Sequence, residues 1–442
     1  MDIYTMYTFF QPKHFAMKKI YLIGIALAGA LGFQSCSGTD DTVGTPDAGP
    51  DQIISLAVAN GNGAATRTGR PLLSSAADQS IENVVVYVVN ASDNTIVATK
   101  TFNDWQNESA DYRINDGRYT EFLLDDKLDD GTYRIFAVGY HDNSDYGDIP
   151  SALVSGSTFQ ENAVLTLGTD NGAEELFAGS TEPFAVLKAQ GFKKEIVLNR
   201  QVAGVYVYAK DIPYIEGASV LRLVSADENN LLVLGQFANL DMTDNGTGSG
   251  ITTAVMNGAS TAPEFDKTLA TIDLNEWFVT LEDADGDNMI DTGAAYANWQ
   301  KPSRYNGAAT FEKGSVFSGA FVIPFAKVDM AQTLKLQLTT ASGDVKREWN
   351  VNLPTTDPYT LYSWDGTDFG SGIPVTEDAN VYNIVRNHLY GLGTRDTDDP
   401  GQGTDTDPVP GDNDDPISLN NKHELKLIVN DNWEIIHDME LD

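Results

Sequence analysis

The most regular alternation of hydrophobic and polar positions lies near the C-terminus, between Lys422 and Leu441. From Leu425 onward almost every second position is apolar, and the positions between are mostly Lys, Asn, Glu and Asp. Side chains of a strand alternate between its two faces, so this pattern predicts a strand, 422–442, with one buried face. The apolar face comprises Leu425, Leu427, Val429, Trp433, Ile435, Met439 and Leu441.

A linker, 396–421, precedes this strand, and most of it consists of Asp, Pro, Gly, Thr and Asn. Such a composition buries too little apolar surface to fold, so we expect an acidic, extended tether. A tethered strand can pair with a sheet of its own molecule or with a sheet of another one. Spacing alone leaves both alternatives open.

The body of the chain, from about Pro71 to Arg395, predicts many short strands. Leu334–Val351 forms the clearest hairpin, with Ala341–Asp344 as its turn, and no long segment has helical periodicity. This pattern predicts an all-β protein, and its length predicts two β-sandwiches with a break near Asp211–Gly217. The other expected strands are Ile81–Val89, Thr95–Phe102, Tyr133–Tyr140, Val164–Leu167, Glu195–Tyr208 and Val220–Val233.

The N-terminal region carries an export signal. Met17 is followed by two lysines and an apolar run, 20–32, that is too short to span a membrane. The segment Phe33-Gln34-Ser35-Cys36 resembles the lipobox of bacterial lipoproteins, which makes Cys36 the expected site of lipidation. Residues 1–16 are interpreted as an upstream extension. The alternative is a plain secreted protein with an incidental cysteine.

A spacer and a short strand, 37–67, follow the signal. Ile54, Leu56 and Val58 alternate within the strand expected at Gln52–Ala59. The next residues are small and flexible around Arg67, so the loop is open to an Arg-specific protease that cuts between Arg67 and Thr68. Two exposed loop arginines without a role are the alternative.

The charge of the chain limits the classes of partner that it can bind, and its cysteine count limits its disulfides. The chain of 442 residues has 28 Lys and Arg against 64 Asp and Glu, a net charge of -36. This charge argues against nucleic acid and anionic membrane surfaces as partners. A single Cys excludes an intrachain disulfide.

One acidic stretch is similar to part of a calcium loop. It places oxygen ligands at alternate positions, namely Asp283, Asp285, Asp287 and Asp291, with the carbonyl of Met289 among them. The expected Glu at the twelfth position is Ala294, so an ordinary solvated acidic turn is the preferred interpretation. We expect no other cofactor, and no histidine or serine pattern marks a catalytic site, so we expect no enzyme.

Several motifs together resemble the Bacteroidia-type fimbrillins, which build type V pili. The motifs are the lipobox at Cys36, the loop Thr66-Arg67-Thr68, the segments Glu175–Gly179, Val197–Val205 and Val381–Tyr390, and Val429–Trp433 near the end. Phe33 in the lipobox, Asn199 before Arg200 and the acidic tether depart from the family pattern.

The resemblance implies two transthyretin-like β-sandwiches, expected at 68–212 and 213–395, in an outer-membrane lipoprotein precursor. A gingipain-like, Arg-specific protease would remove the lipidated segment with its first strand and leave an open groove. The C-terminal strand of another pilus subunit would then fill this groove, and the fimbria would support adhesion, with a host surface as a further partner. The alternatives are a tip, accessory or anchor subunit, and a monomeric surface lipoprotein that binds glycan or calcium.

Overall fold

The computed structural model describes the chain in segments. These are residues 50–58, 81–111, 118–141, 145–168, 173–225, 231–235, 253–258, 267–305, 311–326, 334–351, 359–364, 367–375, 383–393, 416–420 and 435–437. Within them the protein is nearly all β, which confirms the predicted fold class. The helices described are short: α1 (Trp105–Glu108), α2 (Ile149–Ala152), α3 (Leu274–Trp277), and the 3-10 turns η1 (Ala294–Tyr296) and η2 (Ser303–Tyr305).

The N-terminal half is built on one large sheet with the strand order β3-β2-β6-β10-β12-β1-β5-β4, and β11 also pairs with β6. Its strands are β1 (Gln52–Val58), β2 (Asn83–Asn90), β3 (Ile96–Phe102), β4 (Ala110–Asp111), β5 (Arg118–Leu123), β6 (Gly131–Tyr140), β10 (Leu176–Ser180), β11 (Phe184–Val186) and β12 (Phe192–Arg200). Strand β12 joins two groups of strands, because it pairs with β1 along most of its length and with β10 only at Asn199 and Arg200.

Strands β2 and β6 are buried on both faces, which explains their nearly continuous apolar sequences. One face, including Val84, Val86 and Ile135, packs in a core with β1 and β12. The other face, including Val85 and Phe136, packs in a second core with α2 and β9 (Val164–Thr166). The hairpin β7 (Val154–Ser155) and β8 (Thr158–Phe159) lies beside this second core.

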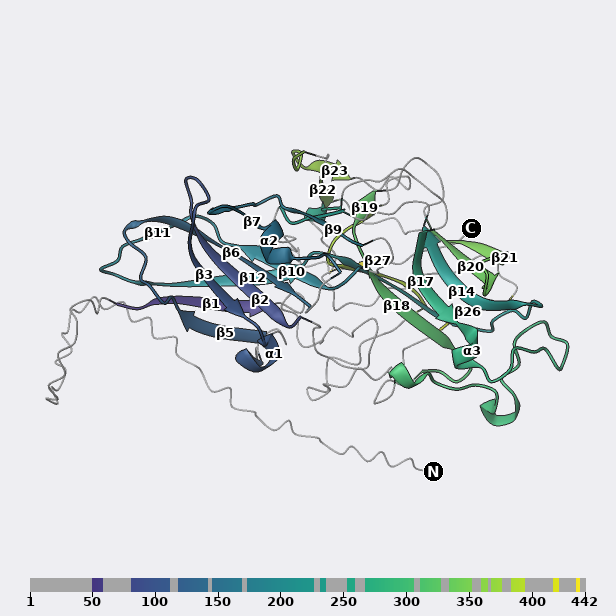
Figure 1. Cartoon of the computed structure of the whole chain (residues 1–442). Coiled ribbons are helices and arrows are strands. Elements are labelled where there is room, and N and C mark those ends of the chain that lie inside the picture. The colour runs from purple at the N-terminus through teal and green to yellow at the C-terminus, as the bar shows by residue number, and fades with distance from the viewer. Residues whose placement is uncertain are drawn as a thin grey trace, which may run out of the picture. The chain divides into compact units, whose positions relative to one another are not determined.

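The C-terminal half contains a five-stranded and a four-stranded sheet around a third core, which includes Tyr208, Trp277 and Leu336. The first sheet consists of β18 (Val316–Val322), β13 (Ala203–Lys210), β25 (His388–Leu392), β27 (Ile435–His437) and β26 (Ile417–Ser418). The second consists of β17 (Lys267–Asp273), β14 (Ala218–Ser225), β20 (Leu334–Thr340) and β21 (Val345–Val351) (Figure 1). The remaining strands are β15 (Leu231–Val233), β16 (Thr253–Met256), β19 (Phe325–Ala326), β22 (Tyr359–Ser363), β23 (Ile373–Val375) and β24 (Asn383–Ile384).

Most predicted strands are present, and the hairpin β20–β21 has the predicted turn. The expected strand Glu195–Tyr208 is instead two strands, interrupted at the buried Gln201 and at Val202. Val202 belongs to the second core and Ala203 to the third, while Leu232, Leu234 and Ile323 pack in the second core again; the break expected near Asp211–Gly217 stays a prediction.

The motif Val381–Tyr390 contains a turn between β24 and β25, and Asn387 in this turn has a φ of 58°. A strand through this motif would place Arg386 and His388 on one side, but the left-handed residue between them breaks the alternation.

Candidate functional site, the groove that holds the first strand

Strand β1 is an interior strand of its sheet, although it is separated from its partners by long stretches of sequence. It lies between β12, to which it is parallel, and β5, to which it is antiparallel (Figure 1). Pairing covers Gln52–Val58 on β12 and Ile53–Val58 on β5. The two flanking strands therefore form the walls of a groove, and β1 fills it.

The inward face of β1 completes the first core. Ile54, Leu56 and Val58 have no exposed surface, and they pack with apolar side chains of β2, β6 and β12. Burial of a large apolar side chain contributes about 1.5–3 kcal/mol, so these three residues contribute about 5–9 kcal/mol before ordering costs. The strand predicted at Gln52–Ala59 is present as Gln52–Val58, although Ser55 and Ala57 on its other face are also buried.

The first residue of β1 is held by a pair of buried hydrogen bonds. The Gln52 Nε2 donates to the Leu128 carbonyl oxygen at 3.0 Å, and the Leu128 backbone N–H donates to Gln52 Oε1 at 2.7 Å. Both residues are buried, with exposed fractions of 2% and 6%. A strand in this groove thus meets a backbone donor and a backbone acceptor that both need a partner.

Gly191 shapes the entrance of the groove. It has a φ of +64°, and a Cβ at this position would lie 2.3 Å from the carbonyl oxygen of Asp51. Any side chain here would strain the backbone and also clash with the start of β1. Gly191 is therefore required for β1 to lie against β12.

The outward face of β1 is crossed by charged side chains from both neighbours. Ser55 Oγ donates to Glu121 Oε1 at 3.1 Å, and Lys193 forms an ion pair with the same carboxylate. Glu121 belongs to β5 and Lys193 to β12, so the pair closes over β1. Hydrogen bonds from Lys193 and then Tyr119 lower the pKa of Glu121 to about 2.

Two motifs of the family resemblance meet in a buried ion pair. Arg200 Nε and Nη2 donate to Glu175 Oε1 at 2.9 and 2.5 Å, and each side chain is 5% exposed. The guanidinium also lies over the ring of Phe177, with its Cζ 4.9 Å from the centroid. Gly179 in the same motif allows close approach, because a Cβ there would lie 2.1 Å from the carbonyl oxygen of Val197.

The third motif packs against the second through Arg386, which is 2% exposed. Its Nη1 donates to Gln201 Oε1 at 2.7 Å, and Gln201 Nε2 donates to the Asn199 carbonyl oxygen at 2.8 Å. These buried residues hold backbone and side-chain polar groups together, as expected for a structural role.

The predicted export and cleavage residues, Cys36, Arg67 and Thr68, lie outside the described residues. Most of the predicted donor strand also does, namely Leu425, Leu427, Val429, Trp433, Met439 and Leu441. Ile435 belongs to the short strand β27, whose backbone pairs in parallel with β25 of the same chain, Ile435 opposite His388.

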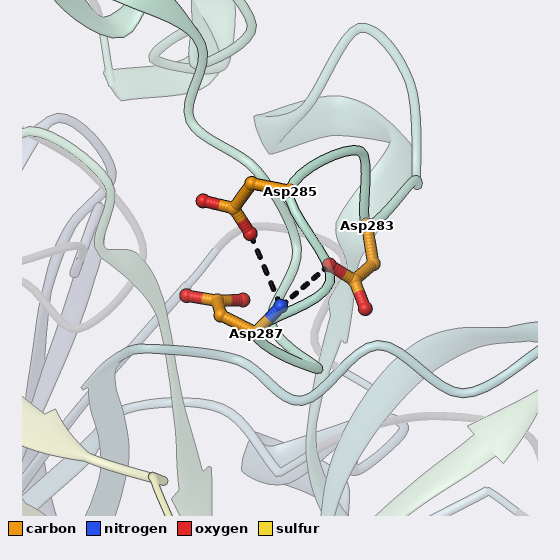
Figure 2. Close-up of side chains that lie close together, drawn as sticks. All are labelled: Asp283, Asp285 and Asp287. Carbon is orange, nitrogen blue, oxygen red and sulfur yellow. Dashed lines mark hydrogen bonds between the residues drawn. The ribbon is translucent and has the colours of Figure 1, made fainter.

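The acidic loop brings together three of its four expected carboxylate ligands, Asp283, Asp285 and Asp287 (Figure 2). Their carboxylate oxygens lie within 4.8 Å of one another, and Asp291 is not part of this group. Asp291 instead accepts a hydrogen bond from the backbone of Ala284. The calcium site stays a prediction.

The three carboxylates are already engaged by the backbone of the loop. Asp283 accepts hydrogen bonds from the N–H groups of Gly286, Asp287 and Asn288, at 2.8 to 3.1 Å. Asp285 also accepts one from Asp287, at 3.1 Å. Such bonds stabilise a tight acidic turn without any ligand.

Three tryptophans that could serve the alternative glycan-binding role pack with other rings. Trp105 has no exposed surface and meets Phe102 edge to face at 5.7 Å. Trp299 packs against Trp277 at 6.3 Å, and Trp364 against Phe369 at 5.2 Å. Among the described residues, no helix has the length and apolar character needed to cross a membrane.

The sequence analysis identified β1 but missed its supporting residues, which are Leu128, Gly191, Glu121 and Lys193. Their contacts link segments that are distant in sequence, so no local pattern marks them. Gln52 did carry a signal, since it is the polar residue that begins an otherwise apolar alternation.

The described residues form an all-β protein with a strand-filled groove and a buried polar network. Residues 67–283 match the model of a family described as Fimbrillin-A associated anchor proteins Mfa1 and Mfa2. Over these residues the chain is similar to fimbrillin-type proteins, which supports the family that its motifs resemble. A search of curated proteins finds no match.

Solved structures with a distant likeness include fimbrial proteins, proteins described as putative adhesins and one described as putative polysaccharide binding proteins. The fimbrial anchor protein Mfa2 from Porphyromonas gingivalis is 11% identical, covering 76% of this chain and 99% of that one, with a TM-score of 0.32. The tip fimbrial protein Mfa3 from the same organism, with a C-terminal truncation, is 12% identical, covering 78% and 95%, with a TM-score of 0.37. A fimbrial assembly protein from Parabacteroides distasonis is 12% identical, covering 76% and 98%, with a TM-score of 0.35.

Proposed function

We propose that this protein is a structural subunit of a cell-surface fimbria that polymerises by donor-strand exchange. It is exported as a lipoprotein precursor with its lipid on Cys36. An Arg-specific protease cuts after Arg67 and releases the N-terminal segment. The C-terminal strand of another subunit then enters the groove, and the fibre supports adhesion.

The observation that carries this proposal is the position of β1. It lies in the middle of a sheet, yet it belongs to the segment before Arg67 and has no other described element on its N-terminal side. Its loss would expose the apolar walls of the groove together with two unpaired strand edges. A sheet opened in this way binds a new strand readily.

A second candidate, a membrane anchor subunit, is favoured by the matched family, whose description names anchor proteins. An anchor of this kind keeps its lipid and its own β1, and it offers only its C-terminal strand to a neighbour. Cleavage at Arg67 separates the two candidates.

The proposal also predicts that β1 keeps the precursor soluble by filling its own groove. We expect a variant lacking residues 1–67 to aggregate or polymerise, as size-exclusion chromatography with light scattering will measure. The full chain, with β1 in place, is the control. A stable, soluble monomer without residues 1–67 would contradict the proposal.

A further inference from the structure

We propose that the groove accepts the C-terminal strand of a second copy in one register, with His423–Val429 in the places of Gln52–Val58. This inference rests on the proposed function and adds the residue-by-residue alignment of the exchanged strand. It is drawn from the polar groups that the walls of the groove present to β1.

The first requirement lies at the start of the groove. Leu128 directs a buried N–H and a buried carbonyl oxygen at Gln52, so the residue in that place needs a hydrogen-bonding side chain. A neutral histidine has one donor and one acceptor nitrogen, which point away from each other on the ring. His423 therefore bonds one of the two Leu128 groups, whereas the Gln52 amide bonds both.

The second requirement is the apolar face at Ile54, Leu56 and Val58. In the proposed register Leu425, Leu427 and Val429 take these three places. The sequence QIISLAV is thus matched by HELKLIV, with closely similar apolar side chains at each inward position.

The third requirement is the charge on the two walls. Ile53 lies opposite Lys193 on β12, and Ser55 lies opposite Glu121 on β5. In the proposed register Glu424 replaces Ile53 and faces Lys193.

Lys426 replaces Ser55 in the same alignment and faces Glu121. Opposite charges on neighbouring strands stabilise their pairing, and like charges oppose it. The exchanged strand therefore replaces the Lys193–Glu121 ion pair with two pairs, one between Glu424 and Lys193 and one between Lys426 and Glu121.

Other registers with the same direction place a polar group in the core. Moving the strand by two residues in one direction puts Asp431 in the place of Val58, and moving it in the other direction puts His423 in the place of Ile54. A larger shift that places Trp433 in the core brings His437 to the place of Val58. Burial of a carboxylate or an imidazole without a partner is costly.

Disulfide trapping in the full chain tests the register. Leu123→Cys on β5 and Lys193→Cys on β12 both lie opposite Ile53, and both native side chains are exposed. Each wall cysteine is combined with Glu424→Cys to test the proposed register. In the matched controls it is combined with Lys422→Cys or Lys426→Cys, which would lie in the place of Ile53 if the strand were shifted by two residues. Cys36, the only native cysteine, leaves with the cleaved segment.

After Arg-specific proteolysis and mild oxidation, denaturing gels without and with reductant reveal the links. We expect intermolecular disulfides with Glu424→Cys from both walls and none with either control. Links formed by a control, or ladders in which Glu424→Cys links to neither wall, would overturn the register and leave the proposed function intact. If cleavage yields no SDS-resistant ladders for the native chain, the proposed function fails and the register fails with it.

A second measurement uses charge alone. We expect Lys426→Glu to slow ladder formation several-fold, since it places a like charge opposite Glu121. The double variant Lys426→Glu with Glu121→Lys should regain most of the native rate. A native rate for the single variant would contradict the alignment.

Discussion

The buried ion pair between Arg200 and Glu175 connects β12 with the segment before β10, and its disruption offers a sharp test of the fold. We consider Arg200→Met, Glu175→Leu and the double variant. Arg200→Met leaves the Glu175 carboxylate, which is 5% exposed, without its cation. An uncompensated buried charge costs about 3–5 kcal/mol, so each single variant should lose stability of that order.

The double variant is expected to be far more stable than the sum of the single losses predicts. Apolar side chains of similar volume replace both charges, so its loss should be within about 2 kcal/mol of the native protein. The removed contact of Arg200 with the ring of Phe177 contributes to that loss. Urea unfolding followed by tryptophan fluorescence measures all three free energies of unfolding.

The exposed pair Lys335–Glu348 is the matched control, because its side chains are 24% and 43% exposed. Removal of Lys335 should cost less than about 1 kcal/mol. The reasoning would be refuted if the double variant lost as much unfolding free energy as the two single variants together. That result would show that the two charges act independently.

Three further predictions follow from the structure. Gly179→Ala places a Cβ 2.1 Å from a backbone carbonyl oxygen of β12, so it should lower the unfolding free energy, measured by urea titration, by about 3 kcal/mol. Gly370 has open space around it, so Gly370→Ala is the control and should leave the unfolding free energy nearly unchanged. The hydrogen bond from Lys193 lowers the pKa of Glu121 from 4.5 to about 2, so the ionised Glu121 carboxylate stabilises the fold fully above pH 4.5 and loses this contribution as the pH falls towards 2. The difference in Tm between the native chain and Glu121→Gln should therefore vanish over that pH range. A difference that stays constant would contradict this assignment. Asp283→Ala removes the acceptor of three backbone N–H groups, those of residues 286–288. Hydrogen exchange at these three amides should become faster, while the unfolding free energy falls by only about 1 kcal/mol. Unchanged exchange would count against the role of this carboxylate in the turn.

Local sequence patterns predicted the strands well where each strand has its own alternation or apolar run. The strands at Ile96–Phe102 and Gly131–Tyr140 and the hairpin from Leu334 to Val351 all lie within a residue or two of the prediction. Turn residues bounded them, so the limits of these strands were also readable. The all-β class followed directly from these elements.

The interruptions of two strands were not predictable, because they depend on contacts between distant segments. Gln201 lies between Arg200 and Val202 within a stretch that suits one continuous strand, and the strand is interrupted where its side-chain amide bonds the Asn199 carbonyl oxygen and Arg386. The turn at Asn387 likewise has no local Gly or Pro to mark it. Such positions are set by tertiary hydrogen bonds and not by propensity.

The candidate site was only half visible in the sequence for the same reason. The alternation of Ile54, Leu56 and Val58 indicated a strand, and its place between β5 and β12 came from the structure. The residues that shape the groove act through backbone groups or through a missing Cβ, as at Leu128 and Gly191. Neither a hydrogen bond to a backbone group nor the need for a missing Cβ can be inferred from the residue types nearby in the sequence.

The central claim is that removal of the first strand by proteolysis starts assembly. The most direct measurement is to treat the purified precursor with an Arg-specific protease, sequence the new N-terminus and size the product on denaturing gels. The account predicts a new N-terminus at Thr68 together with conversion of the monomer to SDS-resistant ladders. An intact chain, or a chain that is cut at Arg67 and stays monomeric, would contradict it.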